Sequence, residues 1–398
     1  MTTTSEVLLP AGEGLSWLRQ TSVDQARVLV AGCGALGNEV LKNLVLSGIR
    51  HIVVIDFDRV EPSNLTRSIL FRQQDAALRR LKVETVAERL RQINPALQLL
   101  PLYGDVAHDV GLGLLRRMDV AIGCVDNRLA RYALNRLCMR AGIPWVDGGI
   151  SRLEGTARVF RPGENCYACN LGPEGLNDLA RRMPCAGTIR RNETAHRAPT
   201  TSLIASIIGA VQVQEALKLL QPDTLASGET VSLCGKMFHY DGQYLTTRLV
   251  EFRAYDDECP VHEPWWPVQP SSITPATSIG EALRLLGQQL GTTDLSLLLD
   301  DDCFVDGVER MTDGRYIPLQ LPGREVAAFI DRHPDLRGTP LQALRQHEYH
   351  RIDRQFPYPA LTLARLGIPP GDVLHITDNR REWFVEMDMT DYTAFCTR

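Results

Sequence analysis

A glycine-rich turn near the start of the chain constrains its fold more than any other feature. The turn reads Gly-Cys-Gly-Ala-Leu-Gly and follows the apolar run 28–31, with its glycines at Gly32, Gly34 and Gly37. Such a turn between a strand and a helix brings backbone N–H groups and a helix N-terminus close to a phosphate. The glycines alone would indicate a dinucleotide-binding domain, and they are a weak signal by themselves.

Charged and amide residues follow the turn in an order that indicates a different ligand. The first, Asp56, ends the next apolar run nineteen residues after Gly37. Basic side chains neutralise phosphate oxygens and carboxylates bind magnesium, so the set predicts one site for ATP and Mg2+. The remaining members are Asp58, Asn64, Arg67, Lys82, Asp126 and Asn127.

Two other nucleotide-binding classes compete with this interpretation. In a nicotinamide-binding domain, Arg67 and Lys82 would simply be surface charges, and that alternative stays open. A P-loop ATPase is disfavoured, because no Gly-Lys-Ser or Gly-Lys-Thr follows the glycine turn.

The order of apolar segments predicts the fold class. Alternation of strands and helices favours an α/β, doubly wound, Rossmann-like domain with a largely parallel sheet. Its ligand should lie at the carboxyl ends of the strands, where the glycine turn, Asp56 and Asp126 all fall. Strands are expected at 28–31, 52–56, 119–123 and 144–146, with helices at 38–47, 78–93 and 128–141.

The second half of the chain is expected to hold a connection, a helix, a hairpin and a further domain. Residues 165–200 are polar and hard to place as regular structure, and long connections in compact domains are often functional. A proline-rich linker should lead to a smaller C-terminal α+β domain at 276–398. Expected elements are helices at 201–220 and 279–290, a β-segment at 235–251, and strands at 295–299, 373–376 and 383–387.

Composition limits the classes of partner that the protein is expected to bind. The chain has 398 residues, 44% of them apolar, and a formal net charge of −5, which fits two ordinary domains. No basic block indicates a nucleic acid, no apolar run approaches the roughly 18 residues that span a bilayer, and no signal peptide is recognised. We therefore expect a cytoplasmic protein that binds neither nucleic acid nor membrane.

Two short ligand pairs predict a metal site. Cys166 and Cys169 have Cys-x-x-Cys spacing, and Cys259 and His262 form a Cys-x-x-His pair much later. Four soft or borderline ligands in two knuckles suit tetrahedral Zn2+. The alternatives are a redox dithiol at 166 and 169 with Cys259 incidental, and chance.

The ordered set from about residue 20 to 262 resembles the ThiF/MoeB and ubiquitin-activating-enzyme superfamily, which adenylates the C-terminal glycine of ubiquitin-like proteins. The resemblance implies that the glycine turn holds the nucleotide, that Asp56 binds its ribose, and that Asp126 helps to hold magnesium. It implies that Arg67 and Lys82 bind phosphates, while Asp58 and Asn64 match the residues after the ribose acid. Two departures are Ser68, where many relatives carry Gln, and His262, where most carry Cys.

Cys185 is the candidate nucleophile within the polar connection. Its surroundings, Met-Pro-Cys-Ala-Gly-Thr-Ile-Arg over 183–190, resemble the catalytic-cysteine segment of activating enzymes, with two extra residues before Thr188. A thiolate attacks an acyl-adenylate readily, and the arginines on both sides favour the thiolate. A cysteine without a role, or one that transfers sulfur, is the alternative.

Together these features predict an activating enzyme for a ubiquitin-like protein. It would adenylate the partner's C-terminal glycine, form a thioester on Cys185 and pass the acyl group to a conjugating enzyme. The resemblance further implies a homodimer and, more remotely, a bacterial conjugation operon linked to antiphage defence. The expected division is an adenylation domain at 1–262 with the catalytic-cysteine loop at about 163–200, a linker at 263–275, and a partner-binding domain at 276–398. The alternatives are a sulfur-carrier adenylyltransferase for thiamin or molybdopterin, and a non-catalytic scaffold subunit.

Overall fold

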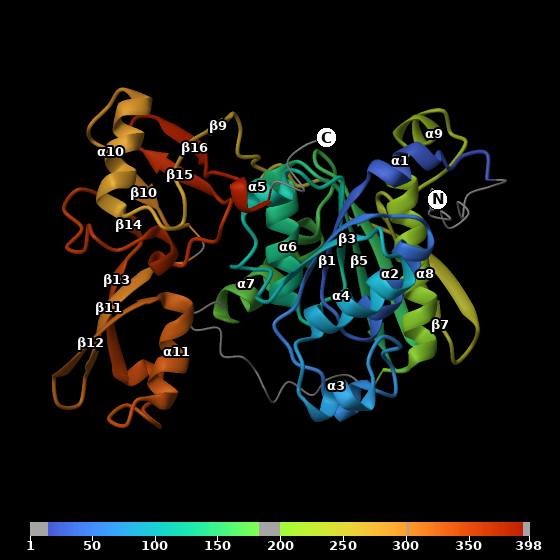
Figure 1. Ribbon diagram of the computed structural model, residues 1–398, viewed down its shortest axis with the longest axis horizontal. Helices are drawn as coiled ribbons and strands as arrows, with labels where there is room; N and C mark the ends of the chain where they lie inside the picture. Colours follow the sequence, from blue (N-terminus) through green and yellow to red (C-terminus); the bar gives the residue numbers. More distant parts are fainter. Residues whose placement is uncertain (1–14, 183–199, 301, 393–398) are drawn as a thin grey trace, which may run out of the picture.

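The computed structural model describes residues 15–182, 200–300 and 302–392. Figure 1 shows two lobes side by side. One lobe is a large sheet with helices on both faces, and the other is built from the C-terminal part of the chain. The α/β, doubly wound fold with an additional C-terminal α+β region is therefore confirmed.

An eight-stranded sheet forms the centre of the first lobe, in the order β3-β2-β1-β4-β5-β6-β7-β8. The first five strands in sequence run parallel, and the last three are added antiparallel. The strands are β1 (Arg27–Ala31), β2 (His51–Ile55), β3 (Gln98–Leu102), β4 (Val120–Gly123), β5 (Trp145–Ser151), β6 (Glu154–Phe160), β7 (Lys236–Asp241) and β8 (Thr246–Glu251).

Strand β1 shows why this sheet is covered on both sides. Val28 and Val30 point into one hydrophobic cluster, whereas Leu29 and Ala31 point into another, and all four are fully buried. Central parallel strands have this continuous apolar character because helices cover both faces. The flanking helices are α1 (Gln20–Gln25), α2 (Ala35–Leu46), α3 (Gln73–Ala77), α4 (Lys82–Ile93), α5 (Leu112–Leu115), α6 (Arg128–Ala141), α7 (Tyr167–Arg182), α8 (Ser202–Leu219) and α9 (Pro222–Ala226).

Several boundaries differ from the sequence-based expectation. The helix expected at 78–93 begins later, as α4 at Lys82, and a separate short helix, α3, precedes the expected range. Arg79 lies between the two helices in the left-handed region at φ 48°. Strand β3 was not predicted. The first part of the connection at 165–200 is also helical, as α7, with non-helical geometry at Gly172.

Helix α8 corrects the expectation that no segment is apolar enough to span a bilayer. By length and composition alone it passes that test, with a mean hydropathy of 1.2. In the structure, however, half of it is buried, and it packs between α2 and the strands β5 and β6. Its apolar character is thus that of a core helix with neighbours on several sides.

The C-terminal lobe contains two sheets where the sequence indicated only one set of strands. A five-stranded sheet has the order β14-β10-β15-β16-β9, and a three-stranded antiparallel sheet has the order β12-β11-β13. The strands are β9 (Val268–Pro270), β10 (Ser296–Leu298), β11 (Phe304–Arg310), β12 (Arg315–Pro322), β13 (Leu344–Tyr349), β14 (Arg351–Ile352), β15 (Val373–Thr377) and β16 (Glu382–Glu386), with helices α10 (Ile279–Leu290) and α11 (Gly323–Arg332). Strand β9 lies within the stretch expected as a linker and pairs with β16.

Charged and apolar contacts join the two lobes at α5. The carboxylate of Glu386 accepts hydrogen bonds from Arg116 at 2.7 Å and from Arg117 at 2.8 and 2.9 Å. The backbone N–H of Leu112 donates to Asp372, and Val373 packs in the same hydrophobic cluster as α5. The C-terminal lobe therefore completes part of the core that covers the large sheet.

A tryptophan from the expected linker lies at the same contact. Trp265 stacks on Phe384 with ring centroids 5.0 Å apart, and Arg140 of α6 lies 4.0 Å from its ring centroid. His375 lies beside this ring and bonds to Asp300 at 2.7 Å. Burial lowers the pKa of His375, but the carboxylates of Asp300 and Glu382 outweigh burial and raise the pKa above its usual value.

Candidate functional site

The glycines of the turn have different structural roles. Gly32 has φ +101°, and a Cβ there would lie 2.6 Å from the carbonyl oxygen of Cys124. A Cβ at Gly37 would lie 1.9 Å from the carbonyl oxygen of Gly32. Both positions therefore exclude side chains because of the protein's own packing. A Cβ at Gly34 would meet no atom of the described residues within 4 Å, so this glycine leaves open space at the N-terminus of α2.

Asp56 is held at the end of β2 by backbone groups. Its carboxylate accepts hydrogen bonds from the N–H of Cys33 at 2.6 Å and of Asp58 at 2.7 Å. Burial raises the pKa of this carboxyl, and the Lys82 ammonium and the two amides oppose the rise without cancelling it. The side chain is thus fixed against the glycine turn.

Lys82 reaches the same place from the first residue of α4. Its ammonium lies 2.7 Å from the carboxylate of Asp58, and its side chain is only 5% exposed. A buried ammonium needs such a partner, because removing its hydration is costly. The surface-charge interpretation of Lys82 is therefore wrong.

The segment that carries Arg67 is anchored by Asn64 and Asn38. The buried Asn64 side chain accepts from the N–H of Glu61 at 3.0 Å, and the Arg67 N–H donates to the Asn64 carbonyl at 3.1 Å. Asn38 donates to the carbonyls of Cys33 and Gly34 and accepts from the Leu70 N–H at 2.9 Å. It therefore ties the glycine turn to the residues that follow Arg67.

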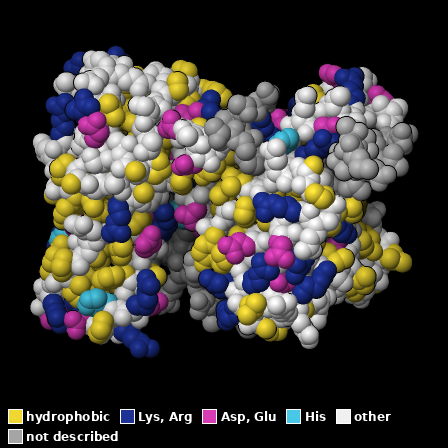
Figure 2. All heavy atoms as spheres, in the orientation of Figure 1, with side chains coloured by type: hydrophobic (Ala, Val, Ile, Leu, Met, Phe, Trp, Pro, Cys, Tyr) yellow, Lys and Arg dark blue, Asp and Glu magenta, His cyan; other side chains and the backbone are white. Residues whose placement is uncertain are grey.

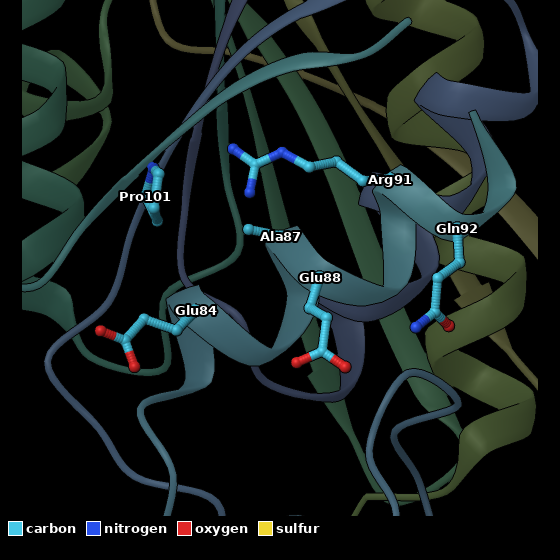
Figure 3. A pocket seen from close by; sticks show the side chains of 6 residues that line it. All are labelled: Glu84, Ala87, Glu88, Arg91, Gln92 and Pro101. Atoms are coloured by element: carbon cyan, nitrogen blue, oxygen red, sulfur yellow. The ribbon is translucent and has the colours of Figure 1, made fainter. Parts of the chain in front are cut away.

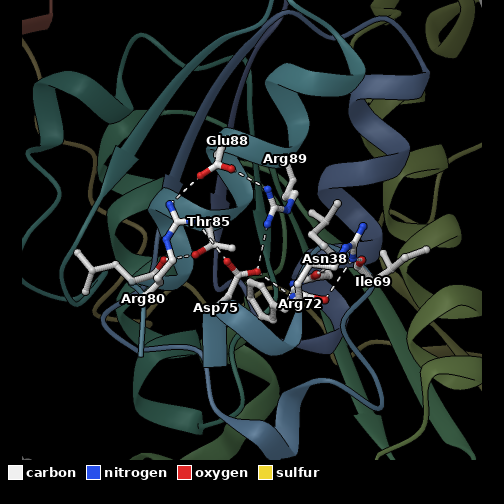
Figure 4. A network of polar contacts seen from close by, with 11 residues as sticks. Asn38, Ile69, Arg72, Asp75, Arg80, Thr85, Glu88 and Arg89 are labelled. Carbon is white, nitrogen blue, oxygen red and sulfur yellow. Dashed lines mark hydrogen bonds and ion pairs between the residues drawn. The ribbon is translucent and has the colours of Figure 1, made fainter. Parts of the chain in front are cut away.

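A network of ion pairs and hydrogen bonds around Asp75 supports the segment that carries Arg67 (Figure 4). The carboxylate of Asp75 is 1% exposed and accepts from the Arg72 backbone at 2.8 Å and from Arg80 and Arg89 at 3.2 and 3.4 Å. Arg80 also pairs with Glu88 at 2.7 Å. Figure 2 shows basic and acidic side chains intermixed over α3 and α4. These contacts fix α3 onto α4 and thereby restrict the loop that carries Arg67.

Asp126 and Asn127 follow β4, the strand on the other side of β1. Both are exposed, and the Asn127 side chain accepts from the Ala130 N–H at 2.8 Å as the N-cap of α6. Arg131 holds this loop by donating to the Val125 carbonyl at 2.8 Å and to Asp147 at 2.9 Å. Arg158 contacts the other oxygen of Asp147, which is fully buried.

The strand order explains why these residues share one edge of the sheet. The chain moves outward through β1, β2 and β3 and then returns to place β4 beside β1. Ligands of doubly wound sheets bind where this reversal opens a crevice at the carboxyl ends of the strands. The glycine turn, Asp56 and Asp126 follow β1, β2 and β4 at that reversal.

Asn38, Arg131, Asp147 and Arg158 were not predicted. The only local signal was an asparagine directly after the glycine turn, at the start of a largely apolar helix. Asp147 and the two arginines belong to three separate elements, so nothing in the linear pattern connects them.

The four predicted metal ligands come together although ninety residues separate the pairs. The sulfur of Cys166 lies 3.6 Å from that of Cys169 and 3.7 Å from that of Cys259, and Cys169 lies 3.2 Å from Nε2 of His262. Tetrahedral zinc with bonds of about 2.3 Å places sulfur ligands about 3.8 Å apart, so the donor set fits Zn2+. Tyr255 stacks on His262 with centroids 4.3 Å apart. This geometry favours a metal site over an isolated dithiol.

Neither the predicted nucleophile nor a depression beside α4 adds to the site as described. Cys185 lies outside the described residues, so the structure gives no geometry for the predicted nucleophile. An open depression between α4 and β3 is lined by Glu84, Arg91 and Pro101 among others (Figure 3). It contains none of the predicted nucleotide-binding residues and is not part of the candidate site.

Comparisons with known proteins find one matching family model and several similar proteins. A family model described as the ThiF family matches residues 10–261. The SAMP-activating enzyme E1 of Haloferax volcanii is 34% identical over 240 residues, covering 59% of this chain and 80% of the relative. The molybdopterin-synthase adenylyltransferase of Salmonella typhimurium is 33% identical over 224 residues, covering 55% and 82%. A solved structure of E. coli MccB with ATP aligns with 61% of this chain and 68% of that one, at 20% identity and a TM-score of 0.48.

Proposed function

Because this chain belongs to the ThiF family, we propose that it activates a ubiquitin-like protein by adenylating its C-terminal glycine with ATP. Its relatives include an enzyme named as an activator of SAMP and one named as a molybdopterin-synthase adenylyltransferase. The observation that carries the proposal is the meeting of Gly34, Asp56 and Lys82 at the sheet reversal, where a nucleotide phosphate and ribose have matching partners. We place this reaction in the cytoplasm.

The proposed first step is a displacement at the α-phosphorus of ATP. A carboxylate oxygen of the partner forms the new P–O bond while the bond to the β-phosphate oxygen breaks, so pyrophosphate leaves and an acyl-adenylate remains. Arg67 and Lys82 would neutralise the phosphate oxygens, and Asp56 would hold the ribose. Asp126 would supply an oxygen ligand to Mg2+, which offsets the charge of the leaving pyrophosphate when bound.

We propose a second step on Cys185. Its thiolate would attack the acyl carbon of the adenylate and expel AMP, leaving a thioester that a conjugating enzyme can accept. Zn2+ held by Cys166, Cys169, Cys259 and His262 would supply a structural link between the start of the connection and the exit of the adenylation domain.

The experiment is ATP–pyrophosphate exchange with candidate ubiquitin-like proteins. Arg67→Ala and Asp126→Ala should reduce the exchange rate by about 10²-fold or more, because one well-aimed charge contributes about 3 kcal/mol to such a transition state. The matched controls are Arg19→Ala and Asp223→Ala, which remove the partners of one exposed ion pair and should exchange normally. Normal exchange in Arg67→Ala would reject the site.

The second candidate is adenylation for a sulfur-carrier protein without a thioester. The Salmonella adenylyltransferase supports this second candidate, because its sequence identity to this chain is 33%, against 34% for the SAMP-activating enzyme. One measurement distinguishes the two candidate functions. An enzyme that forms a thioester gives a reductant-sensitive adduct with the ubiquitin-like protein, and Cys185→Ala loses that adduct. A sulfur-carrier adenylyltransferase forms no such adduct even as the wild type. A scaffold subunit would exchange no pyrophosphate at all.

We also propose that the adenylation domain forms a homodimer. In support, β8 is exposed along its whole length, with Leu249 at 59%, and Leu203 of α8 is 68% exposed. Exposed apolar groups on a sheet edge favour pairing with another chain. Sedimentation of Leu249→Lys as a monomer would support this surface, and an unchanged dimer would move the interface elsewhere.

For the C-terminal lobe we propose a role in binding the conjugating enzyme. Met311 is 61% exposed between β11 and β12, on a lobe that has no other part in the proposed chemistry. Met311→Glu should therefore slow thioester transfer to the conjugating enzyme while pyrophosphate exchange stays normal. Equal transfer rates would leave this surface without a role.

A further inference from the structure

Three metal-ligating side chains converge in the C-terminal lobe, outside the proposed adenylation and zinc sites. Cys303 immediately precedes β11, Glu348 lies in β13, and His350 follows β13. The thiol sulfur, a carboxylate oxygen and an imidazole nitrogen all lie within 4.8 Å of one another. Nothing in the adenylation chemistry uses them.

The strand register explains the convergence. In the antiparallel pairing of β11 and β13, Phe304 is opposite Tyr349 and Val305 is opposite Glu348. Continuing that register by one residue places Cys303 opposite His350. Because side chains alternate along a strand, Glu348 and His350 point to the same face as Cys303. Two ligands from one strand and a third from its neighbour leave a fourth coordination position open, as in many zinc sites with three protein ligands.

The sulfur of Cys303 lies at the buried end of the cluster. Cys303 is 1% exposed, and a Cβ at Gly323 would lie 2.5 Å from its sulfur. The sulfur therefore packs against the first residue of α11. Burial and the carboxylates of Glu348 and Asp302 raise the pKa of this thiol to about 12, so a bound cation must displace its proton. The His350 side chain is 64% exposed, which gives an ion access from solvent, and its Nε2 already lies 3.2 Å from Glu348.

We propose that Cys303, Glu348 and His350 bind one Zn2+ ion, with water as the fourth ligand. Binding replaces the thiol S–H bond with a Zn–S bond and releases that proton to solvent. Thiolate and imidazole select Zn2+ or Co2+ over Mg2+ and Ca2+, which prefer oxygen ligands. The ion would tie β11, β13 and the start of α11 together.

The test is the number of zinc equivalents that the full-length chain retains after equilibrium dialysis against Zn2+. Cys303→Ala and His350→Ala should each hold one equivalent less than the wild type. His347→Ala is the matched control, because His347 is in the same strand, points to the other face and contacts Tyr316 instead. Cys259→Ser removes a ligand of the other cluster, so its loss of an equivalent should add to that of His350→Ala.

Equal zinc content in wild type, Cys303→Ala and His350→Ala would overturn the proposal. His350 is exposed, so its replacement should leave the lobe folded and the comparison interpretable. If His350→Ala lost one zinc equivalent and Cys303→Ala lost none, the zinc would be bound by a surface histidine alone. That result would also overturn the proposal. With Co2+ as the probe, the thiolate-to-metal absorption should decrease in Cys303→Ala and stay unchanged in His347→Ala.

Discussion

Replacing Asn38 by alanine should both destabilise the adenylation domain and slow its chemistry. The fully buried side chain bonds to the Cys33 and Gly34 carbonyls at 2.8 and 3.1 Å and to the Leu70 N–H at 2.9 Å. The Gly34 carbonyl keeps a backbone partner in Asn38→Ala, because the N–H of residue 38 still donates to it. Two buried polar groups would remain unsatisfied, at about 1–3 kcal/mol each, so we expect a loss of about 2–6 kcal/mol.

The functional loss should exceed what lower stability explains, because Asn38 joins the glycine turn to the segment of Arg67. Urea unfolding gives the first quantity, and pyrophosphate exchange under conditions where the variant stays folded gives the second. We expect a decrease in kcat, with KM for ATP less affected, since the misplaced charge acts on the transition state. Ser278→Ala, which removes the N-cap of α10 at a cost of about 1 kcal/mol, should exchange normally. Normal kcat in a folded Asn38→Ala would refute the positioning role, and unchanged stability would refute the hydrogen bonds.

Four further outcomes are expected. Cys185→Ala should form the acyl-adenylate but no reductant-sensitive adduct, measured by gel mobility with and without thiol; an adduct that persists would assign the thioester to another cysteine. Chelation of zinc, or Cys259→Ser, should lower the melting temperature, because metal binding contributes directly to folding; zinc-free purified protein of normal stability would reject the four-ligand site. Glu386→Gln should cost up to about 3 kcal/mol by removing the shared partner of two arginines between the lobes, measured by urea unfolding, and a loss below the error of that method would show that apolar packing alone joins them. The raised pKa of His375 means that its contribution to stability is complete below its unfolded pKa of about 6.5 and is lost as pH rises through the folded pKa. His375→Gln should flatten that part of the stability profile, and an unchanged profile would show that another group titrates.

Local patterns were sufficient to predict four of the five parallel strands, and β3 was missed. The runs 28–31 and 120–123 carry no charged or polar side chain, which is typical of a strand covered on both faces, and both are central strands. The C-terminal lobe was harder, because β11 and β12 pair across a bulge at Val305 and Gly307 that breaks the alternation. Strand β9 was hidden by Pro270 and the prolines around it in sequence, and a proline is tolerated at the sheet edge that β9 occupies.

The residues of the candidate site also divide into those that local sequence patterns predict and those that they do not. The glycine turn, the predicted ribose-binding acid and the two pairs of metal ligands each follow a short, regular spacing. Their positions could therefore be predicted from the sequence. The groups that hold them cannot, because each depends on a contact between distant elements. Asn38 reaches a loop thirty-two residues away, and the ion pair of Arg131 with Asp147 joins α6 to β5. The salt bridge of Lys82 with Asp58 likewise needed the structure to show that the ammonium is buried.

We propose above all that this chain adenylates the C-terminal carboxylate of a ubiquitin-like protein at the carboxyl edge of its large sheet. The most direct measurement is the intact mass of candidate small proteins ending in glycine after incubation with the Cys185→Ala protein, ATP and Mg2+, because this variant cannot pass the adenylate on to the proposed thioester. One partner should gain the mass of a single AMP group, and pyrophosphate should appear in equal amount. Both should disappear when Arg67→Ala is added to this variant and persist when Arg19→Ala is added. An AMP adduct that forms equally fast with and without Arg67→Ala would contradict the account.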